Sequence, residues 1–457
     1  MLNPVFDSDT GVHEACGVVG LWNVPEAAHV AALALHALQH RGQEAAGIAV
    51  CREGRIKRYK GMGLVSQVFG RDELAGLPGA AAVGHVRYST AGGSRPANAQ
   101  PLLGRTAGGE VALAHNGNLS RGDELANFLL REGSLLQTST DSELMLHFLA
   151  RQKSLEPDAV SRMLGQCGAA FSVALLTKDR LMAARDPWGF RPLALGRLNG
   201  GWMVASESCA FDQTGARFER EIEPGELVCI DDTGVVSHFF VENRPVPARC
   251  LLELIYFARP DSRIFGHTPH IFRQMSGRAL AKEHPADVDI VVAVPDSGVS
   301  AAMGYAEALG VPLDRGIIRN HYVGRSFIAP GQAARNLAVR MKHNVVAEVV
   351  RGKRVALVDD SLIRGTTARA IDRELRESGA KEVHLRIACP PTLHPCVYGV
   401  DFPNHSELAA HGKNLEDVRL ALEVDSLGYL SLQGMLDLFP PEDRGFCTAC
   451  WNGDYRV

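Results

Sequence analysis

The first half of the chain alternates short apolar runs with glycine-containing turns. These runs cover residues 17–21, 45–50, 81–85, 111–114 and 172–176. Apolar residues recur with helical spacing at residues 27–39 and 142–151. Many strands with few helices predict a layered, largely antiparallel domain.

The pattern changes after residues 242–247, a segment with two prolines and no periodicity. We take this segment as the linker. Beyond it, an apolar strand at 289–294 precedes a helix that ends near Leu309. Further strands are predicted at 311–318, 355–358 and 383–388, with a helix from Gly365 to about Gly379. Such strand–helix alternation predicts a parallel sheet that binds ligands at the C-terminal ends of its strands.

Length and composition limit the class of protein. A chain of 457 residues is too long for one ordinary core, so two or three domains are expected. A composition of 46% hydrophobic and 22% charged residues is typical of a globular protein. The net charge of −4 does not indicate a basic surface for nucleic acid or an anionic membrane. No apolar run reaches the roughly 18 residues of a membrane span. Residues 1–15 lack Lys, Arg and an apolar core, so they are not a secretory signal.

The default location is therefore the cytoplasm, where ten cysteines argue against a disulfide framework. In that setting cysteines point to a nucleophile, a metal site or plain core thiols.

The most informative segment of the second half runs from Arg354 to Thr367. Asp359 and Asp360 directly follow the apolar residues 355–358, and Gly365, Thr366 and Thr367 open the next helix. Carboxylates at a strand end can face ribose hydroxyls and a metal ion, while helix N-terminal amides can hold a phosphate. An ordinary strand–turn–helix with two solvated acids is the alternative.

A second loop, Asp296-Ser297-Gly298, would meet this segment at the same sheet edge. Its backbone amides suit a further anionic group such as pyrophosphate. Ser297, Asp359 and Asp360 offer hard oxygen ligands, which favour Mg²⁺. Residues 319–344 are polar and basic, as expected of a mobile lid over a polyphosphate or of a plain exposed loop.

A cysteine leads the first apolar strand of the chain. If residues 1–15 were removed, Cys16 would be the N-terminus, and its own α-amine could accept the thiol proton. An uncut Cys16 would be only a strand cysteine. Arg87 ends another apolar strand and can bind an α-carboxylate bidentately.

Two further positions complete a possible glutamine site. The Asn116 side chain and the Gly117 backbone N–H, in a turn after an apolar run, could form an oxyanion hole. Asp141 begins a helix and could bind an α-ammonium group, or it could be an ordinary helix cap.

Cys447 and Cys450 form a Cys-x-x-Cys pair close to the C-terminus. Such a pair can be a redox site, half of a zinc site or part of an iron–sulfur site. Spacing alone does not select two more ligands from the ten cysteines.

Longer strings carry a family resemblance. The run Val358-Asp-Asp-Ser-Leu-Ile-Arg-Gly-Thr-Thr367 resembles the phosphoribosylpyrophosphate (PRPP) loop of type I phosphoribosyltransferases. Cys16, Arg87, Asn116–Gly117, Asp141 and the string from Gln39 to Gly47 resemble the N-terminal-nucleophile glutaminase domain of class II amidotransferases. Together with Arg319-Asn-His-Tyr-Val-Gly-Arg-Ser-Phe-Ile328, they resemble the glutamine PRPP amidotransferases, whose similarity spans the chain after residue 15.

This resemblance implies a domain plan: a propeptide at 1–15, an α+β glutaminase domain of stacked antiparallel sheets between helices at 16–245, and an α/β phosphoribosyltransferase domain with a parallel sheet at 246–457. It implies that Cys16 is the nucleophile, that Asn116 and Gly117 form the oxyanion hole, and that Arg87 and Asp141 bind glutamine. The implied PRPP site contains Asp296, Ser297, Gly298, Asp359, Asp360, Ser361, Arg364, Gly365, Thr366 and Thr367, with Mg²⁺ at Ser297, Asp359 and Asp360.

The resemblance extends to the iron–sulfur branch of that family. There, four cysteines at the places of Cys250, Cys396, Cys447 and Cys450 hold a structural [4Fe–4S] cluster. Zinc is the alternative occupant, and Cys389 is the rival ligand because it is close in sequence to Cys396.

The implied activity is glutamine hydrolysis through a Cys16 thioester, with ammonia passing to PRPP to give 5-phosphoribosylamine, glutamate and pyrophosphate, the opening step of purine synthesis. Purine nucleotides as feedback inhibitors and a homotetramer are also implied. One alternative is another class II enzyme, glucosamine-phosphate synthase, which should lack the Asp359–Asp360 loop. A non-catalytic nucleotide-sensing regulator on a phosphoribosyltransferase fold is the other.

Overall fold

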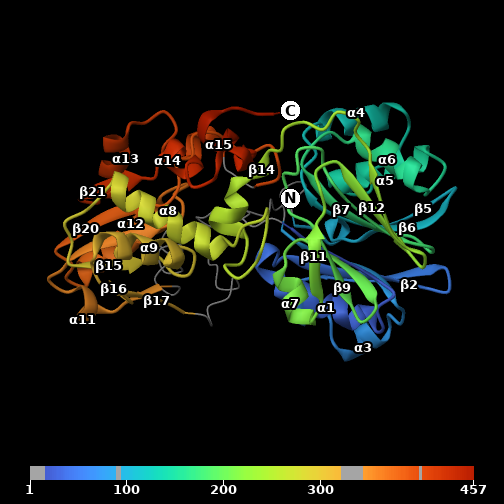
Figure 1. The fold of residues 1–457 in the computed structure, drawn as a ribbon, viewed down its shortest axis with the longest axis horizontal. Helices are drawn as coiled ribbons and strands as arrows, with labels where there is room; N and C mark the ends of the chain where they lie inside the picture. Colours follow the sequence, from blue (N-terminus) through green and yellow to red (C-terminus); the bar gives the residue numbers. More distant parts are fainter. Residues whose placement is uncertain (1–15, 89–93, 321–342, 401–403, 457) are drawn as a thin grey trace, which may run out of the picture.

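The computed structural model describes residues 16–88, 94–320, 343–400 and 404–456. The proposed leader, Ser89, Thr90 and residues 321–342 of the basic segment lie outside the described residues. Figure 1 shows two lobes side by side, with the first half of the chain (blue to green) on the right and the second half (yellow to red) on the left.

The first lobe contains two stacked antiparallel sheets. One sheet has the strand order β11 (Arg217–Glu221), β9 (Ala194–Leu198), β10 (Gly201–Ala205), β1 (Gly17–Trp22), β4 (Ala81–Arg87), β2 (Ala45–Arg52) and β3 (Arg55–Met62). The other has the order β13 (Gly234–Phe239), β12 (Glu226–Asp231), β8 (Leu181–Arg185), β7 (Phe171–Leu176), β6 (Gly109–Gly117) and β5 (Leu102–Thr106).

Helices cover the outer face of each sheet, so the lobe has four layers (Figure 1). The helices on the side of the first sheet are α1 (Ala27–Ala37), α2 (Val65–Val68), α3 (Arg71–Ala75) and α7 (Cys209–Thr214). Those on the side of the second sheet are α4 (Gly122–Arg131), α5 (Asp141–Arg151) and α6 (Pro157–Gln166). Between the sheets, small and branched side chains such as Val18, Val83, Ala114 and Val228 form a separate core. Their burial holds the facing strands β1, β4 and β6 together.

The second lobe is built on a parallel five-stranded sheet. Its order is β16 (Leu313–Asp314), β15 (Ile290–Ala293), β19 (Arg354–Asp359), β20 (Glu382–Ile387) and β21 (Ser426–Tyr429). The helices of this lobe are α8 (Pro269–Glu283), α9 (Val299–Leu309), α11 (Ala347–Val350), α12 (Thr366–Glu377), α13 (Leu415–Leu422), α14 (Leu432–Leu436) and α15 (Ala449–Asn452). The interior residues of β15 and β19 are apolar, as expected of strands covered on both faces, whereas β20 alternates apolar Val383, Leu385 and Ile387 with polar residues.

Two small sheets complete the described part of the lobe: β17 (Ile317–Arg319) with β18 (His343–Val345), and β14 (Arg249–Cys250) with β22 (Phe446–Cys447).

The predicted strand at 311–318 is wrong as a single element. Its residues divide between β16, in the main sheet, and β17, in a separate antiparallel pair, with Gly316 between them. A side chain at Gly316 would meet Val292 at 2.7 Å, so the chain turns away where it approaches β15 closely.

The predicted fold class is confirmed: antiparallel sheets between helices, followed by a parallel α/β sheet. The segment predicted as the linker, residues 242–247, lies between β13 and β14 and forms neither helix nor strand. The domain boundary at 245/246 stays a prediction. No helix in the described ranges is both long and apolar enough to cross a membrane.

Apolar side chains form one part of the contact between the two lobes. Phe190 of the first lobe stacks on Tyr398 of the second, with ring centroids 4.2 Å apart. Ala169 and Ala170 of the first lobe join the same buried cluster as Ala449 near the C-terminus. The Asn118 side chain, just after β6, donates to the Val397 carbonyl at 3.1 Å, so a segment of the second lobe lies against the end of β6, where the candidate oxyanion residues are.

Candidate functional site

Neighbouring strands bring Cys16 and Arg87 together. Cys16 precedes β1, Arg87 ends β4, and the two strands pair with Gly17 opposite Val86. Cys16 is buried, and its Sγ donates a hydrogen bond to the Tyr88 carbonyl at 3.3 Å. Burial raises the pKa of the Cys16 thiol, even though Arg87 acts in the opposite direction. The thiol is therefore protonated at neutral pH and needs a base before it can attack.

Asn116 and Gly117 end β6, and Asn116 is on the same face of the strand as Ala112 and Ala114, which pack between the two sheets. Asn116 is buried, yet neither its side-chain oxygen nor its side-chain nitrogen has a hydrogen-bond partner among the described residues. An unsatisfied buried amide costs free energy, so it marks a position where a ligand oxygen can accept the missing bond. Gly117 has φ 138°, and a Cβ there would lie 2.0 Å from the Ala170 carbonyl oxygen, so only glycine fits.

Two buried histidines fix β6 against β4. The His85 ring nitrogen Nε2 lies 2.9 Å from the carbonyl oxygen of His115, which directly precedes Asn116. Burial lowers the pKa of His85 to about 3, so its ring is neutral and can donate this bond. The bond sets the position of Asn116 relative to the strand that ends at Arg87.

Asp141 is the first residue of α5. Its Oδ2 accepts a hydrogen bond from the Leu119 backbone N–H at 2.8 Å, and its Oδ1 lies 3.5 Å from His115 Nδ1. Burial favours the neutral acid, but His115 and the backbone N–H groups of Leu119 and Ser142 outweigh burial and hold the pKa of Asp141 below its usual value. Thr140 occupies the N-cap position, so the helix-cap alternative is wrong. Asp141 is instead an ionised group that ties the loop after β6 to α5.

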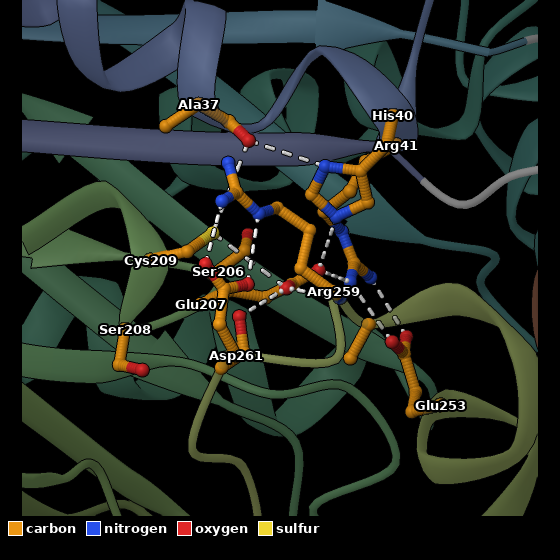
Figure 2. Close-up of polar contacts among 12 residues, drawn as sticks. Ala37, His40, Arg41, Ser206, Glu207, Ser208, Cys209, Glu253, Arg259 and Asp261 are labelled. Atoms are coloured by element: carbon orange, nitrogen blue, oxygen red, sulfur yellow. Dashed lines mark hydrogen bonds and ion pairs between the residues drawn. The ribbon is translucent and has the colours of Figure 1, made fainter. Parts of the chain in front are cut away.

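Sequence reasoning missed the group that holds the backbone of Cys16. The Nε of Arg41 donates to the Cys16 carbonyl at 3.0 Å, and the guanidinium is fully buried between Glu207 and Glu253 (Figure 2). Arg41 lies in the string from Gln39 to Gly47, which we noted only as part of the resemblance. Nothing in the local pattern around Glu253 indicates a contact with the first lobe.

The two predicted phosphosugar loops meet at one edge of the parallel sheet. Strand β15 pairs with β19, and the Val294 N–H donates to the Val358 carbonyl at 2.9 Å. A Cβ on Gly298 would lie 2.6 Å from the Val358 oxygen and 3.1 Å from the Asp359 Cα. Glycine at this position therefore allows the Asp296–Gly298 loop to lie directly against the Asp359–Asp360 loop.

Burial raises the pKa values of both acids at this edge. Asp359 also faces the charge of Asp360, which raises its pKa further. Asp360 accepts hydrogen bonds from the Ser361 and Ser297 hydroxyls, while its Oδ2 is buried with no partner in the described part of the chain. Two crowded acids and an unpartnered carboxylate oxygen are what a divalent cation would stabilise.

The residues predicted to bind the phosphate lie at the start of α12. Gly365, with φ 78°, is the N-cap, and Thr366 and Thr367 begin the helix. The first N–H groups of a helix have no partners within the helix and favour an anion. Arg364 pairs with Glu407 at 2.9 Å, and the exposed Asp296 pairs with Arg319 at 2.7 Å.

The four predicted ligand cysteines surround one cavity between the lobes. Cys250 and Cys447 are direct neighbours across β14 and β22. All four, Cys250, Cys396, Cys447 and Cys450, line the cavity together with Phe190, Leu252, Tyr398, Val400, Ala449 and Tyr455. Burial is the main cause of the raised pKa values of the Cys250, Cys447 and Cys450 thiols, to about 12 for Cys250, and the neighbouring thiolates add to it. Cys389 does not line this cavity: its charged neighbours are Asp360 and Asp359.

Comparison with known proteins decides the family. A glutamine amidotransferase domain matches residues 85–213, and a phosphoribosyl transferase domain matches residues 270–392. The chloroplastic amidophosphoribosyltransferase of Glycine max is 46% identical over 99% of this chain and 80% of its own length. The amidophosphoribosyltransferase of Bacillus subtilis is 45% identical over 97% of this chain and 94% of its own length. The chain belongs to the amidophosphoribosyltransferase family.

Solved structures agree with this family. The glutamine PRPP amidotransferase of B. subtilis, complexed with ADP and GMP, superposes with a TM-score of 0.91 at 44% identity, over 96% of this chain and 97% of that chain. A structure described as the allosteric regulatory enzyme of purine biosynthesis gives a TM-score of 0.92 at 44% identity, over 96% of both chains. Both lobes, and the way they are joined, are therefore those of an amidophosphoribosyltransferase.

Replacing Asn116 with alanine should selectively impair use of glutamine. Asn116→Ala removes the unpartnered amide, and loss of one oxyanion donor costs about 10²–10³-fold in kcat. We expect glutamine hydrolysis to fall by that factor, measured as glutamate release, while synthesis of 5-phosphoribosylamine from added ammonia is unchanged. Asn127→Ala on the exposed face of α4 is the matched control. Equal losses with glutamine and with ammonia would contradict the oxyanion role.

Proposed function

We propose that this chain catalyses the amidophosphoribosyltransferase reaction: glutamine, water and PRPP give 5-phosphoribosylamine, glutamate and pyrophosphate. The observation that carries the proposal is the presence of two complementary sites in one chain. The first lobe has a buried thiol beside an arginine and an unpartnered amide, and the second has an acidic sheet edge beside a helix N-terminus. Similarity to named family members over nearly the whole chain supports it.

In the glutamine half-reaction, Arg87 would bind the substrate α-carboxylate and Asp141 its α-ammonium group. The Cys16 thiol would pass its proton to the α-amine exposed by removal of residues 1–15, and the sulfur would attack the side-chain amide. Asn116 Nδ2 and the Gly117 N–H would stabilise the oxyanion. Collapse to a γ-glutamyl thioester breaks the C–N bond and releases ammonia, and water then frees glutamate.

In the second half-reaction, ammonia displaces pyrophosphate from C1 of PRPP. The nitrogen lone pair forms the new bond, the C1–O bond electrons leave with pyrophosphate, and the nitrogen loses a proton. Gly365, Thr366 and Thr367, with Arg364 and Ser361, would hold the 5-phosphate, and Asp296, Ser297 and Gly298 would face the pyrophosphate. Transfer inside the protein would keep ammonia from being protonated in water.

The residues at the acidic edge fit Mg²⁺. Ser297, Asp359 and Asp360 offer oxygen donors, and the unpartnered Asp360 Oδ2 supports the assignment. When bound, Mg²⁺ supplies positive charge that neutralises the pyrophosphate group. Asp359 and Asp360 would also orient the ribose hydroxyls.

The cysteine-lined cavity has the thiolate donors that a [4Fe–4S] cluster requires, and zinc is the alternative occupant. Cys250, Cys396, Cys447 and Cys450 would hold the cluster, which serves a structural purpose because the transfer chemistry moves no electron.

The remaining family properties are also proposed for this chain. Purine nucleotides would act as feedback inhibitors, in line with the B. subtilis relative that was solved with ADP and GMP. A homotetramer in the cytoplasm is the proposed working form.

Cys16→Ala should separate the two half-reactions. We expect it to abolish glutamate release and glutamine-dependent product formation, while ammonia-dependent synthesis continues, because the second site does not use the thiol. Pyrophosphate release with glutamine or ammonium chloride measures both. Cys51→Ala, in β2, is the control and should behave like the wild type. A Cys16→Ala enzyme that still uses glutamine would overturn the assignment.

The mass of the active protein tests the proposed leader. Intact-mass analysis should show loss of residues 1–15, so that the chain begins at Cys16 with a free α-amine. A fully active sample that retains these residues would refute the N-terminal-nucleophile mechanism.

Anaerobically purified protein should be brown and contain about four irons per chain. Cys396→Ser should lower the iron content and bleach the visible absorption, whereas Cys389→Ser, whose thiol is outside the cavity, should keep both. A colourless, active, zinc-loaded protein would refute the cluster.

A further inference from the structure

One carboxylate of the second lobe is buried among guanidinium groups of the first. Glu253 is fully buried and accepts hydrogen bonds from Arg41 Nη2 at 2.8 Å, Arg41 Nη1 at 2.9 Å and Arg191 Nη1 at 3.0 Å. It begins a π-helical segment, Glu253–Phe257, three residues after Cys250. Single π-turns occur frequently at functional sites, and this one is outside both substrate sites described above.

Arg41 connects this carboxylate to the nucleophile. While Nη1 and Nη2 contact Glu253, Nε of the same guanidinium donates to the Cys16 carbonyl at 3.0 Å. On the other side, Glu207 accepts from Arg41 and from His40 at 2.8 Å (Figure 2). A guanidinium is planar and rigid, so fixing its Nη atoms also fixes where Nε points. The backbone at Cys16, and with it the α-amine and the thiol, is therefore held by Arg41, whose own position is fixed in part by Glu253 of the other lobe.

A second segment of the same lobe supports the oxyanion side of the glutamine site. The Asn118 side chain donates to the Val397 carbonyl at 3.1 Å. Gly399, with φ 94°, lies so close that a Cβ there would be 2.8 Å from the Gly117 carbonyl carbon. Arg191 Nη2 donates to the Tyr398 carbonyl at 2.9 Å, so one arginine joins this segment to Glu253.

We infer that Glu253 is a positioning residue for the glutamine half-reaction: through Arg41 it sets the place of Cys16, and together with the 397–399 segment it makes the glutamine site depend on the second lobe. The inference rests on the proposed function. Glu253 touches neither substrate nor the reacting atoms, so its effect must pass through Arg41. The two contacting segments begin at Cys250 and Cys396, which line the same cavity, so a cluster bound there would anchor both of them.

The test compares Glu253→Gln with Asp443→Asn, each measured as anaerobically purified, full-length enzyme. Gln keeps the shape of Glu253 but loses the charge and one acceptor for the two arginines. We expect kcat for glutamate release to fall about 10- to 100-fold, the cost of a small displacement of a reacting group. The KM for glutamine should stay within about twofold because Arg87 and Asp141 are unchanged.

Ammonia-dependent synthesis is the internal control and should stay within about twofold of wild type in Glu253→Gln. A general folding defect would instead lower both activities in proportion. Asp443 is the matched carboxylate, because it pairs with Arg249 inside the second lobe beside the cysteine site and has no contact with Arg41. Asp443→Asn should retain full glutaminase activity.

Three results would overturn the inference: unchanged glutaminase kcat in Glu253→Gln, equal loss of both activities, or an equal glutaminase loss in Asp443→Asn. Glu253→Asp keeps the charge but shortens the side chain, so it should give an intermediate kcat, and it replaces Glu253→Gln if that variant does not yield soluble enzyme. Failure of the proposed function is a separate outcome, since wild-type enzyme would then make no product from either nitrogen source.

Discussion

A balanced set of buried charges joins the two lobes, and the glutamine site is built around it. Arg41 and Arg191 bring two positive charges into the interior, and Glu207 and Glu253 bring two negative ones. Removing one member of such a set leaves an uncompensated buried charge, which costs about 3–5 kcal/mol. The set is therefore stable only when both lobes are in place, because Glu253 comes from the second lobe and its partners come from the first.

The electrostatic design of the two substrate sites differs. At the glutamine site, burial keeps the Cys16 thiol protonated, so the thiol needs a proton acceptor before it can attack. The buried Asn116 side chain has no hydrogen-bond partner among the described residues, so it can bind an oxyanion. At the phosphosugar edge, burial and like charge hold the pKa values of two acids above their usual range. There, the two acids and the start of α12 suit a cation and an anionic ligand at the C-terminal ends of the strands. Perturbed pKa values and unsatisfied polar groups of this kind are typical of binding centres rather than of structural ion pairs.

Much of the fold followed from local pattern. The alternation of apolar runs and turns predicted the antiparallel lobe, and strand–helix alternation predicted the parallel one. The two acidic and glycine-rich loops met as expected, because neighbouring parallel strands end at the same edge. The strand at 311–318 failed, since an apolar run does not show that one part joins the main sheet while the other pairs with His343–Val345. The cap interpretation of Asp141 failed for a similar reason, because its partner, Leu119, comes from the loop after β6.

By itself, the sequence determined which chemistry each segment could carry: a cysteine before an apolar strand, paired acids after another, and cysteines enough for a cluster. These chemical properties depend only on a side chain and its neighbours in the sequence, and the spacing of apolar residues shows which strand or helix each side chain belongs to. Only the tertiary structure decided which distant residues act together. Arg41, Arg191, Glu207 and Glu253 form one group because packing of the two lobes excludes water from the space between them, and buried charges must then find opposite charges within reach. The residues beside a buried charge in the sequence do not show which distant residue will pair with it. The dependence of Cys16 on the second lobe is therefore seen only in the folded chain.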